Sequence, residues 1–161
     1  MTMYPAPPQG TPPPPPTYGS GPSGPRAGFW TRFAALFIDS IIVSIVPIVF
    51  IAIAAGAHSG GLLALAYLLY FAVYVAYFVY FEGGPAGQTP GKRMLGIRII
   101  DFNNGGPIGY GRAFVRLLGR FIAGFFCYLG YLWMLWDKEK QCWQDKMATD
   151  VVVPVQYYPV P

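Results

Sequence analysis

A single carboxylate inside a long apolar run is the residue with the most distinctive chemistry in this sequence. Asp39 is the only charged residue between positions 33 and 55. An ionised side chain in hydrocarbon is energetically costly, so we expect Asp39 to face the interior of a helix bundle and to find a partner there. One interpretation is an ion or proton site, and the alternative is a structural ion pair that fixes helix packing.

Arginines at helical spacing offer such partners. Arg32 lies seven residues before Asp39, two helical turns away on the same face. Arg112, Arg116 and Arg120 recur every four residues and therefore share one face of a later helix. If that helix packs against the first one, Arg116 and Arg120 are closer charge partners for Asp39.

A glycine-rich segment, 87–93, ends in the basic pair Lys92 and Arg93. It is not a phosphate-binding loop, because Ala86 stands where the first glycine is needed and Arg93 stands where Ser or Thr is needed. We expect Lys92 and Arg93 to contact anionic lipid headgroups, at about 1 kcal/mol for each basic residue near the surface.

Catalytic and metal-binding patterns are missing from the sequence. The only histidine is His58, and Cys127 and Cys142 fit no metal or redox spacing. We interpret Cys127 as a small buried apolar residue. The sequence therefore predicts that the protein is not an enzyme and has no catalytic residue, cofactor or metal site.

Two apolar runs, 33–55 and 62–81, must position these charges. A helix of about 20 residues crosses about 30 Å of hydrocarbon, so each run is long enough to span a bilayer, and the short segment between them predicts a helical hairpin. Hydrophobic residues make up 54% of the chain and charged residues 11%, against about 25% charged in soluble domains. The composition indicates an integral membrane protein.

Basic residues predict the orientation of the hairpin. Arg26 and Arg32 precede the first run, and Lys92, Arg93 and Arg98 follow the second, whereas the connecting turn carries no Lys or Arg. Positive charge favours the cytoplasmic side, which places the N-terminus and the 82–113 segment in the cytoplasm of a multi-pass cell-membrane protein.

The third apolar stretch, 113–136, leaves two alternatives. It is either a third transmembrane helix or a re-entrant or interfacial helical element that returns to the cytoplasm. The three lysines in 137–146 favour the return, because positive charge is depleted on the outer side. A predicted strand at 150–155 favours it too, since its obvious partner is the predicted strand at 96–101 on the cytoplasmic side.

The first 25 residues contain Pro, Gly, Ser, Thr and Tyr and carry no charged side chain. Such a composition cannot bury enough apolar surface to fold, so residues 1–25 are predicted to be a disordered proline-rich tail. Its polyproline run, 12–16, is either a solvated spacer or a ligand for an aromatic-lined groove on a protein partner. The last residues, 156–161, are expected to form a short C-terminal tail.

The order of these residues resembles the RDD family of small bacterial membrane proteins, named for one arginine and two aspartates. Arg32, Asp39 and Asp145 match the three named positions, and the stretch 87–98 is similar to the one that follows the family's second span. Many members have His before the second Asp, where this chain has Gln144. The resemblance implies that Arg32, Asp39 and Asp145 form the candidate site.

The resemblance covers residues 26–155, and the tail before it resembles the proline-rich antigen proteins of mycobacteria. The family suggests transport of some ligand. We therefore expect an all-α membrane domain with a small β pair, acting in a homo-oligomer or membrane complex as a transport component whose polar site is built on Arg32 and Asp39. The alternative is a membrane scaffold that recruits partners through the tail. Neither reading involves nucleic acid.

Overall fold

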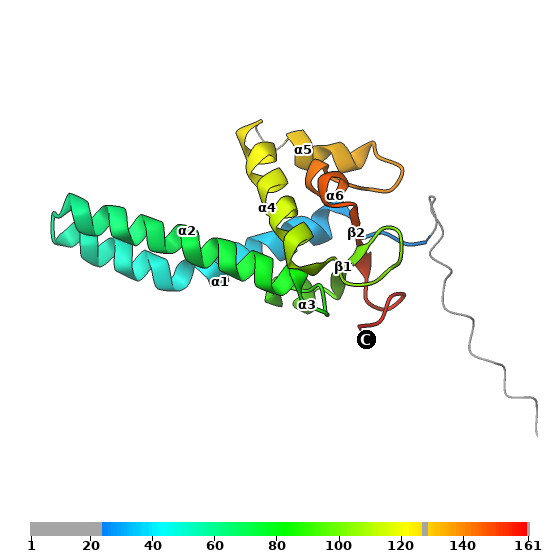
Figure 1. Cartoon of the computed structure of the whole chain (residues 1–161), viewed down its shortest axis with the longest axis horizontal. Helices are drawn as coiled ribbons and strands as arrows, with labels where there is room; N and C mark the ends of the chain where they lie inside the picture. The colour runs from blue at the N-terminus through cyan, green and yellow to red at the C-terminus, as the bar shows by residue number, and fades with distance from the viewer. Residues whose placement is uncertain (1–23, 127–128, 161) are drawn as a thin grey trace, which may run out of the picture.

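Two long helices form a hairpin that dominates the shape of the protein (Figure 1). The structure is a computed structural model and describes residues 24–126 and 129–160. Helix α1 runs over Phe29–Gly56 and α2 over Gly60–Gly83, so both predicted apolar runs are confirmed as helices. The turn between them is tight because His58 adopts a left-handed conformation and the Ser59 hydroxyl accepts a hydrogen bond from the Leu62 backbone N–H.

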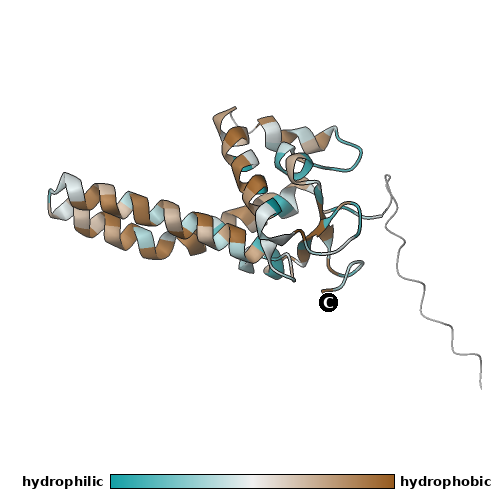
Figure 2. Cartoon of the chain, in the orientation of Figure 1, coloured by the Kyte–Doolittle hydropathy of each residue, from teal (hydrophilic) through white to brown (hydrophobic). Residues whose placement is uncertain are grey.

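Large apolar side chains cover the outside of this hairpin. Within the described residues, α1 and α2 are both long and apolar enough to cross a membrane, and only 17% and 11% of their most apolar stretches are buried. Figure 2 shows the apolar colour along both helices. In water this surface would be strongly unfavourable, so it is suited to lipid or to other membrane-embedded protein.

A compact group of short elements closes one end of the hairpin. It contains α3 (Pro90–Met94), α6 (Trp143–Ala148) and an antiparallel pair of strands, β1 (Ile97–Asp101) and β2 (Asp150–Pro154). The two strands pair from Ile97 opposite Pro154 to Asp101 opposite Asp150, which confirms the predicted β pair. The backbone N–H of Ala27, just before α1, donates to the Val152 carbonyl. The start of α1, β1 and β2 therefore lie together at this end.

The β pair is buried on both faces. One face packs Ile99 and Val152 against Ala35 of α1. The other face packs Ile100 and Val153 against Tyr158, which is 2% exposed. The residues after β2 were expected to form a short tail, but their described part folds back onto the sheet because the Tyr158 ring completes this second apolar layer.

The third apolar stretch is divided among α4 (Gly109–Phe125), α5 (Leu129–Leu132) and a short 3-10 helix, η1 (Trp133–Leu135). Helix α4 crosses α2 obliquely: Tyr110 stacks on Tyr80 near the end of α2, and Phe121 stacks on Phe71 further along it. The chain then bends by 113° into α5 and η1. Because β1 and β2 pair, residues 109–148 begin and end at the same end of the hairpin, as the returning alternative requires (Figure 1).

Helix α4 is strongly amphipathic. Its arginines at 116 and 120 are buried, whereas Phe114, Leu118 and Phe125 on other faces are exposed. This division follows from the four-residue spacing of the arginines. Helix α4 therefore turns its charges toward the rest of the protein and an apolar surface outward. The predicted tail lies outside the described residues up to position 23, as does Cys127.

Candidate functional site

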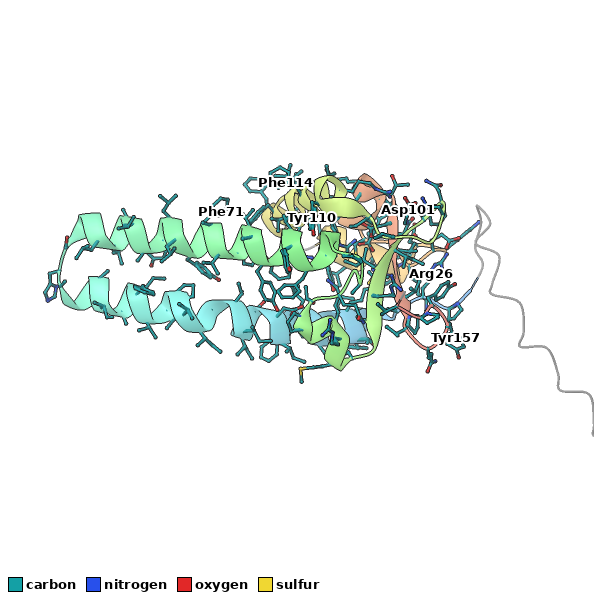
Figure 3. All side chains as sticks on the ribbon, turned by 60° about the horizontal axis from the view of Figure 1, so that its bottom comes forward. Arg26, Phe71, Asp101, Tyr110, Phe114 and Tyr157 are labelled. Atoms are coloured by element: carbon teal, nitrogen blue, oxygen red, sulfur yellow. The ribbon has the colours of Figure 1, made fainter. Side chains whose placement is uncertain are left out.

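Charged side chains are buried where α1, α2, α4 and α6 meet the β pair. Figure 3 shows side chains standing off the hairpin along its length and crowding between the elements at the other end. Arg32, one turn into α1, donates from Nη1 to Asp145 Oδ2 at 2.5 Å. The same Asp145 oxygen accepts the Cys142 backbone N–H at 3.0 Å and so caps α6. The structure thus brings together Arg32 and Asp145, two of the three residues implied by the resemblance.

Arg116 of α4 joins three acidic residues. Its Nη1 donates to Oδ1 of both Asp145 and Asp150, and its Nε lies 3.2 Å from Glu82 Oε2. Arg116 is 2% exposed, and all three carboxylates are fully buried. One guanidinium therefore links α4 to α2, α6 and the first residue of β2.

Glu82, at the end of α2, gathers further cations. Its Oε1 accepts from Lys92 Nζ at 2.5 Å and from Arg120 Nη2 at 2.7 Å. The Arg120 guanidinium also lies over the Phe78 ring, 4.3 Å from its centre. Among the described residues, these contacts connect four cations with three carboxylates in what we call the ion network: Arg32, Lys92, Arg116, Arg120, Glu82, Asp145 and Asp150.

Asp39 is held by hydrogen-bond donors rather than by a cation. Its Oδ1 accepts from Tyr77 Oη and from the Gly91 backbone N–H, both at 2.8 Å, and its Oδ2 accepts from Thr89 Oγ1 at 2.5 Å. Thr89 and Gly91 belong to the first turn of α3, so Asp39 fixes this short helix against α1. Three donors on one carboxylate replace the solvation that burial removes.

This arrangement differs from the expected pairing of Asp39 with Arg116 or Arg120. Helix α4 packs chiefly against α2 and α6 rather than against α1, so its arginines meet Glu82, Asp145 and Asp150 instead. Glu82 and Asp150 were not among the candidate residues. Glu82 directly follows an apolar run and Asp150 opens a strand, and both are common places for a solvated charge.

The two basic residues expected at lipid headgroups, Lys92 and Arg93, lie in different environments. Lys92 is 7% exposed and bound to Glu82, so it faces the protein interior and not the membrane surface. Arg93, the next residue of α3, is exposed and remains the predicted headgroup contact. Successive helical residues point about 100° apart, so the two side chains cannot share one direction.

The pKa values of the two buried acids outside the hairpin, Asp145 and Asp150, shift in opposite directions. Burial disfavours ionised Asp145, but Arg116 and Arg32 outweigh this and hold the pKa of its carboxyl below the usual value. Burial raises the pKa of Asp150 to about 7; Arg116 opposes the shift, and Asp145 and Glu82 add to it. Asp150 is therefore the acid in the ion network whose protonation changes near neutral pH.

A cavity of about 20 Å³ lies beside the ion network. It has room for about one water-sized particle. Within the described ranges, Nε and Nη1 of Arg120 and Oε1 of Gln144 have no hydrogen-bond partner, although both side chains line the cavity. No group of three His, Cys, Asp or Glu side chains in those ranges is arranged to hold a metal ion. The cavity is lined by Arg32, Leu36, Asp39, Lys92, Arg116, Arg120, Tyr131, Gln144 and Val152.

Sequence comparison decides the family. The family profile described as "RDD family" matches residues 26–149, most of the chain. The chain belongs to the RDD family. Its three name-giving positions thus have distinct places: Arg32 and Asp39 line the cavity, and Asp145 lies behind Arg32 as its ion-pair partner.

Curated relatives of this RDD protein include mycobacterial proteins. A "Proline-rich antigen homolog" of Mycobacterium tuberculosis is 37% identical over 47% of this chain and 31% of its own length. The "Proline-rich antigen" of Mycobacterium leprae is 32% identical over 59% of this chain and 39% of its own length. An uncharacterized protein of Bacillus subtilis, YxaI, is 25% identical over 71% of this chain and 88% of its own length.

The chain therefore matches well under half the length of the mycobacterial relatives. No solved structure matches it.

Proposed function

We propose that this RDD protein binds a small ion or ligand in the cavity lined by Arg32 and Asp39, as one subunit of a transport assembly in the cell membrane. The observation that supports this most is the cavity itself, because two of the side chains that line it, Arg120 and Gln144, carry polar atoms without hydrogen-bond partners within the described residues. Buried polar groups normally find partners, so such atoms point to a guest that supplies hydrogen bonds.

The position of the cavity suits entry from one side of a membrane. It lies at the end of a hairpin of membrane-spanning length, beside elements that are compact and polar. The basic residues at this end support a cytoplasmic location for it and for the N-terminus. The hairpin tip, at His58, then lies on the outer side.

Two spanning helices and one oblique helix enclose no pathway of their own, so the proposal requires an oligomer or a membrane complex. The exposed apolar faces of α1 and α2 are available for such contacts, since they carry rows of large side chains without a partner in the described chain.

Filling the cavity tests the proposal. Leu36 lines the cavity and is half-buried, so Leu36→Trp occupies space there without changing any charge. In liposomes containing purified protein, the wild type should move at least one of Na⁺, K⁺, H⁺ or Cl⁻, and Leu36→Trp should reduce that flux at least tenfold. Ile41→Trp is the matched control, because Ile41 is exposed on the same helix and lines no part of the cavity.

Leu36→Trp overpacks this region, which typically costs about 1–3 kcal/mol, so its melting temperature should fall modestly while its oligomer size stays that of the wild type and shows that the variant is folded. Equal flux in the Leu36→Trp and wild-type proteins would contradict the proposal.

A membrane scaffold is the second candidate. It is supported by the extensive pairing of charges in the ion network, which suits a lock between helices, and by the proline-rich sequence before α1. In that case deletion of the tail, residues 1–25, abolishes the cellular role of the protein, while Leu36→Trp leaves it unchanged.

A further inference from the structure

We infer that the cavity is selective for a small monovalent anion of about the size of chloride. This inference rests on the ion-binding function proposed above and names the class of ion that this cavity accepts. Four arguments support it: the charges that line the cavity, the donors that face it, its size, and the charge balance of the ion network.

The lining of the cavity is strongly positive. Arg32, Lys92, Arg116 and Arg120 contribute to the lining, and Asp39 is the one acidic residue in it. Both oxygens of Asp39 are already engaged by Tyr77, Thr89 and Gly91. The acids of the ion network, Glu82, Asp145 and Asp150, are not part of the lining. A cation placed here would meet four positive side chains, and the one carboxylate in the lining, Asp39, already accepts three hydrogen bonds.

Side chains that line the cavity carry hydrogen-bond donors whose acceptors are incomplete among the described residues. Arg120 is 9% exposed, and its Nε and Nη1 lack acceptors among the described residues. The Lys92 ammonium has three N–H groups, and Glu82 is the acceptor of one of them. Gln144 is 3% exposed, and rotation of its amide presents an NH₂ group in place of the oxygen. Charge-assisted N–H donors of this kind replace the hydration shell of an anion.

The cavity volume limits the anion to a small one. At about 20 Å³ the cavity accepts a particle close to the size of a water molecule. Sulfate, phosphate and organic carboxylates are larger and would have to displace Leu36 or Tyr131 from the wall. Interiors are densely packed, so such displacement is unfavourable. A halide ion fits the available space.

The charge balance ties the anion to a proton. The four cations of the ion network are matched in number by the four buried carboxylates Asp39, Glu82, Asp145 and Asp150, so an added anion leaves one negative charge in excess. Asp150 can remove that excess by binding a proton. The charged groups that face it are Arg116 from α4, Asp145 from α6 and Glu82 from α2. The apparent affinity for the anion should therefore be higher at pH 6 than at pH 8.

Chloride-dependent stability provides a direct test. The full chain, purified in mild detergent, is melted while sodium chloride replaces sodium gluconate at constant ionic strength. We expect the melting temperature to rise to a plateau with chloride, because a ligand that binds only the folded state stabilises it. Bromide should act like chloride, sulfate should not, and exchange of Na⁺ for choline should change nothing. A rise that follows Na⁺ instead of chloride would overturn the inference.

A negative charge added to the cavity lining tests whether the chloride-dependent stabilisation arises at the cavity. Gln144→Glu keeps the shape of the side chain and adds a negative charge, so it should lower the apparent chloride affinity at least tenfold. Gln156→Glu is the matched control, since Gln156 is exposed and is not among the residues that line the cavity. If Gln144→Glu does not fold, Leu36→Trp should abolish the chloride effect by occupying the cavity. Unchanged chloride dependence in the folded cavity variant overturns the inference.

The anion site and the transport role can be distinguished by experiment, because each can be contradicted without the other. Chloride-dependent stabilisation without flux of any ion in liposomes supports the anion site and removes the transport role. Flux of Na⁺ or K⁺ by a protein that shows no chloride-dependent stabilisation removes the anion site and leaves the transport role standing.

Discussion

Asp145 and Asp150 contact the same nitrogen of Arg116, yet they behave as different acids. Asp145 has a second cation, Arg32, and a backbone N–H donor from Cys142, so its charged form is favoured. Asp150 shares Arg116 with Asp145, and its Oδ2 has no hydrogen-bond partner within the described residues. The number of donors, and not burial alone, separates the two.

Replacing Asp150 with Asn should therefore stabilise the protein at high pH. The folded protein holds a proton on Asp150 up to about pH 7, whereas an unfolded chain releases it near pH 4, so wild-type stability falls as the pH rises between these values. Asp150→Asn resembles the protonated acid and removes this fall. Melting in detergent at pH 5 and pH 8 should show a variant near wild type at pH 5 and more stable than wild type at pH 8.

Asp145→Asn is the control for this measurement, because it removes charge from an acid whose ionised form is favoured. It should lose about 3–5 kcal/mol at pH 8, as expected when one partner of a buried ion pair is removed. A similar response of the two variants would contradict the assignment of different roles to them.

For individual residues, the sequence predicted which charged side chains face the protein interior more readily than it predicted their partners. It placed a buried carboxylate at Asp39 and an arginine face on α4, since both follow from spacing within one helix. The partners of Asp39 are two hydroxyl groups and a backbone N–H, of which Thr89 and Gly91 lie in a loop–helix junction distant in sequence. Side-chain contacts of this kind depend on tertiary packing, which no local pattern encodes.

At the scale of elements, α3 shows how little space separates the short helices from the hairpin. A Cβ atom on Gly91 would lie 2.5 Å from the Ala35 carbonyl oxygen of α1 and 2.8 Å from Asp39 Oδ1. The first neighbour is backbone, and the second belongs to a carboxylate that three hydrogen bonds hold in place. Glycine at this position allows α3 to approach α1 closely enough for its backbone N–H to reach Asp39.

Gly91→Ala should consequently push α3 away from α1 and destabilise the protein by about 1–3 kcal/mol, the range for a buried acceptor that loses its donor. Gly111→Ala is the matched control, because nothing lies within 4 Å of a Cβ there and Ala favours the α4 helix by up to about 1 kcal/mol. Urea unfolding in mild detergent measures both. Equal stability of the two variants would argue against close packing of α3.

Elements themselves were the part of the fold most accessible from sequence. The two long apolar runs predicted α1 and α2, and the short segments 96–101 and 150–155 predicted β1 and β2. The stretch 113–136 was ambiguous because its length alone does not tell a short span from an oblique helix followed by a bend. The pairing of β1 with β2 supplies the missing constraint, and it joins segments separated by the whole of that stretch.

The whole molecule has both of its described ends at one end of the hairpin (Figure 1). Ala27 and Val152 share a backbone hydrogen bond, and Tyr158 packs on the sheet. A third transmembrane crossing would separate these segments by the thickness of a bilayer, about 30 Å of hydrocarbon. The contacts between these segments therefore favour the returning path of residues 109–148 over a third crossing.

Fusion reporters in a bacterial host should therefore place both termini in the cytoplasm and the hairpin tip outside. A fluorescent protein fused to either terminus should be fluorescent, and alkaline phosphatase inserted at His58 should be active. The N-terminal fusion serves as the reference for the C-terminal one. Phosphatase activity from a C-terminal fusion would contradict the returning path of α4, α5 and η1.

The ion pair between Arg32 and Asp145 spans 113 residues of sequence. During synthesis, α1 leaves the ribosome before α6 is made. Arg32 therefore has no Asp145 carboxylate to pair with while the hairpin is being inserted. A chain that stops before α6 keeps an uncompensated arginine at the start of its first helix, and Arg116 likewise lacks two of its three acids. The carboxylate that neutralises Arg32 is thus made only after α1 to α4, so this buried ion pair can form only once α6 is in place.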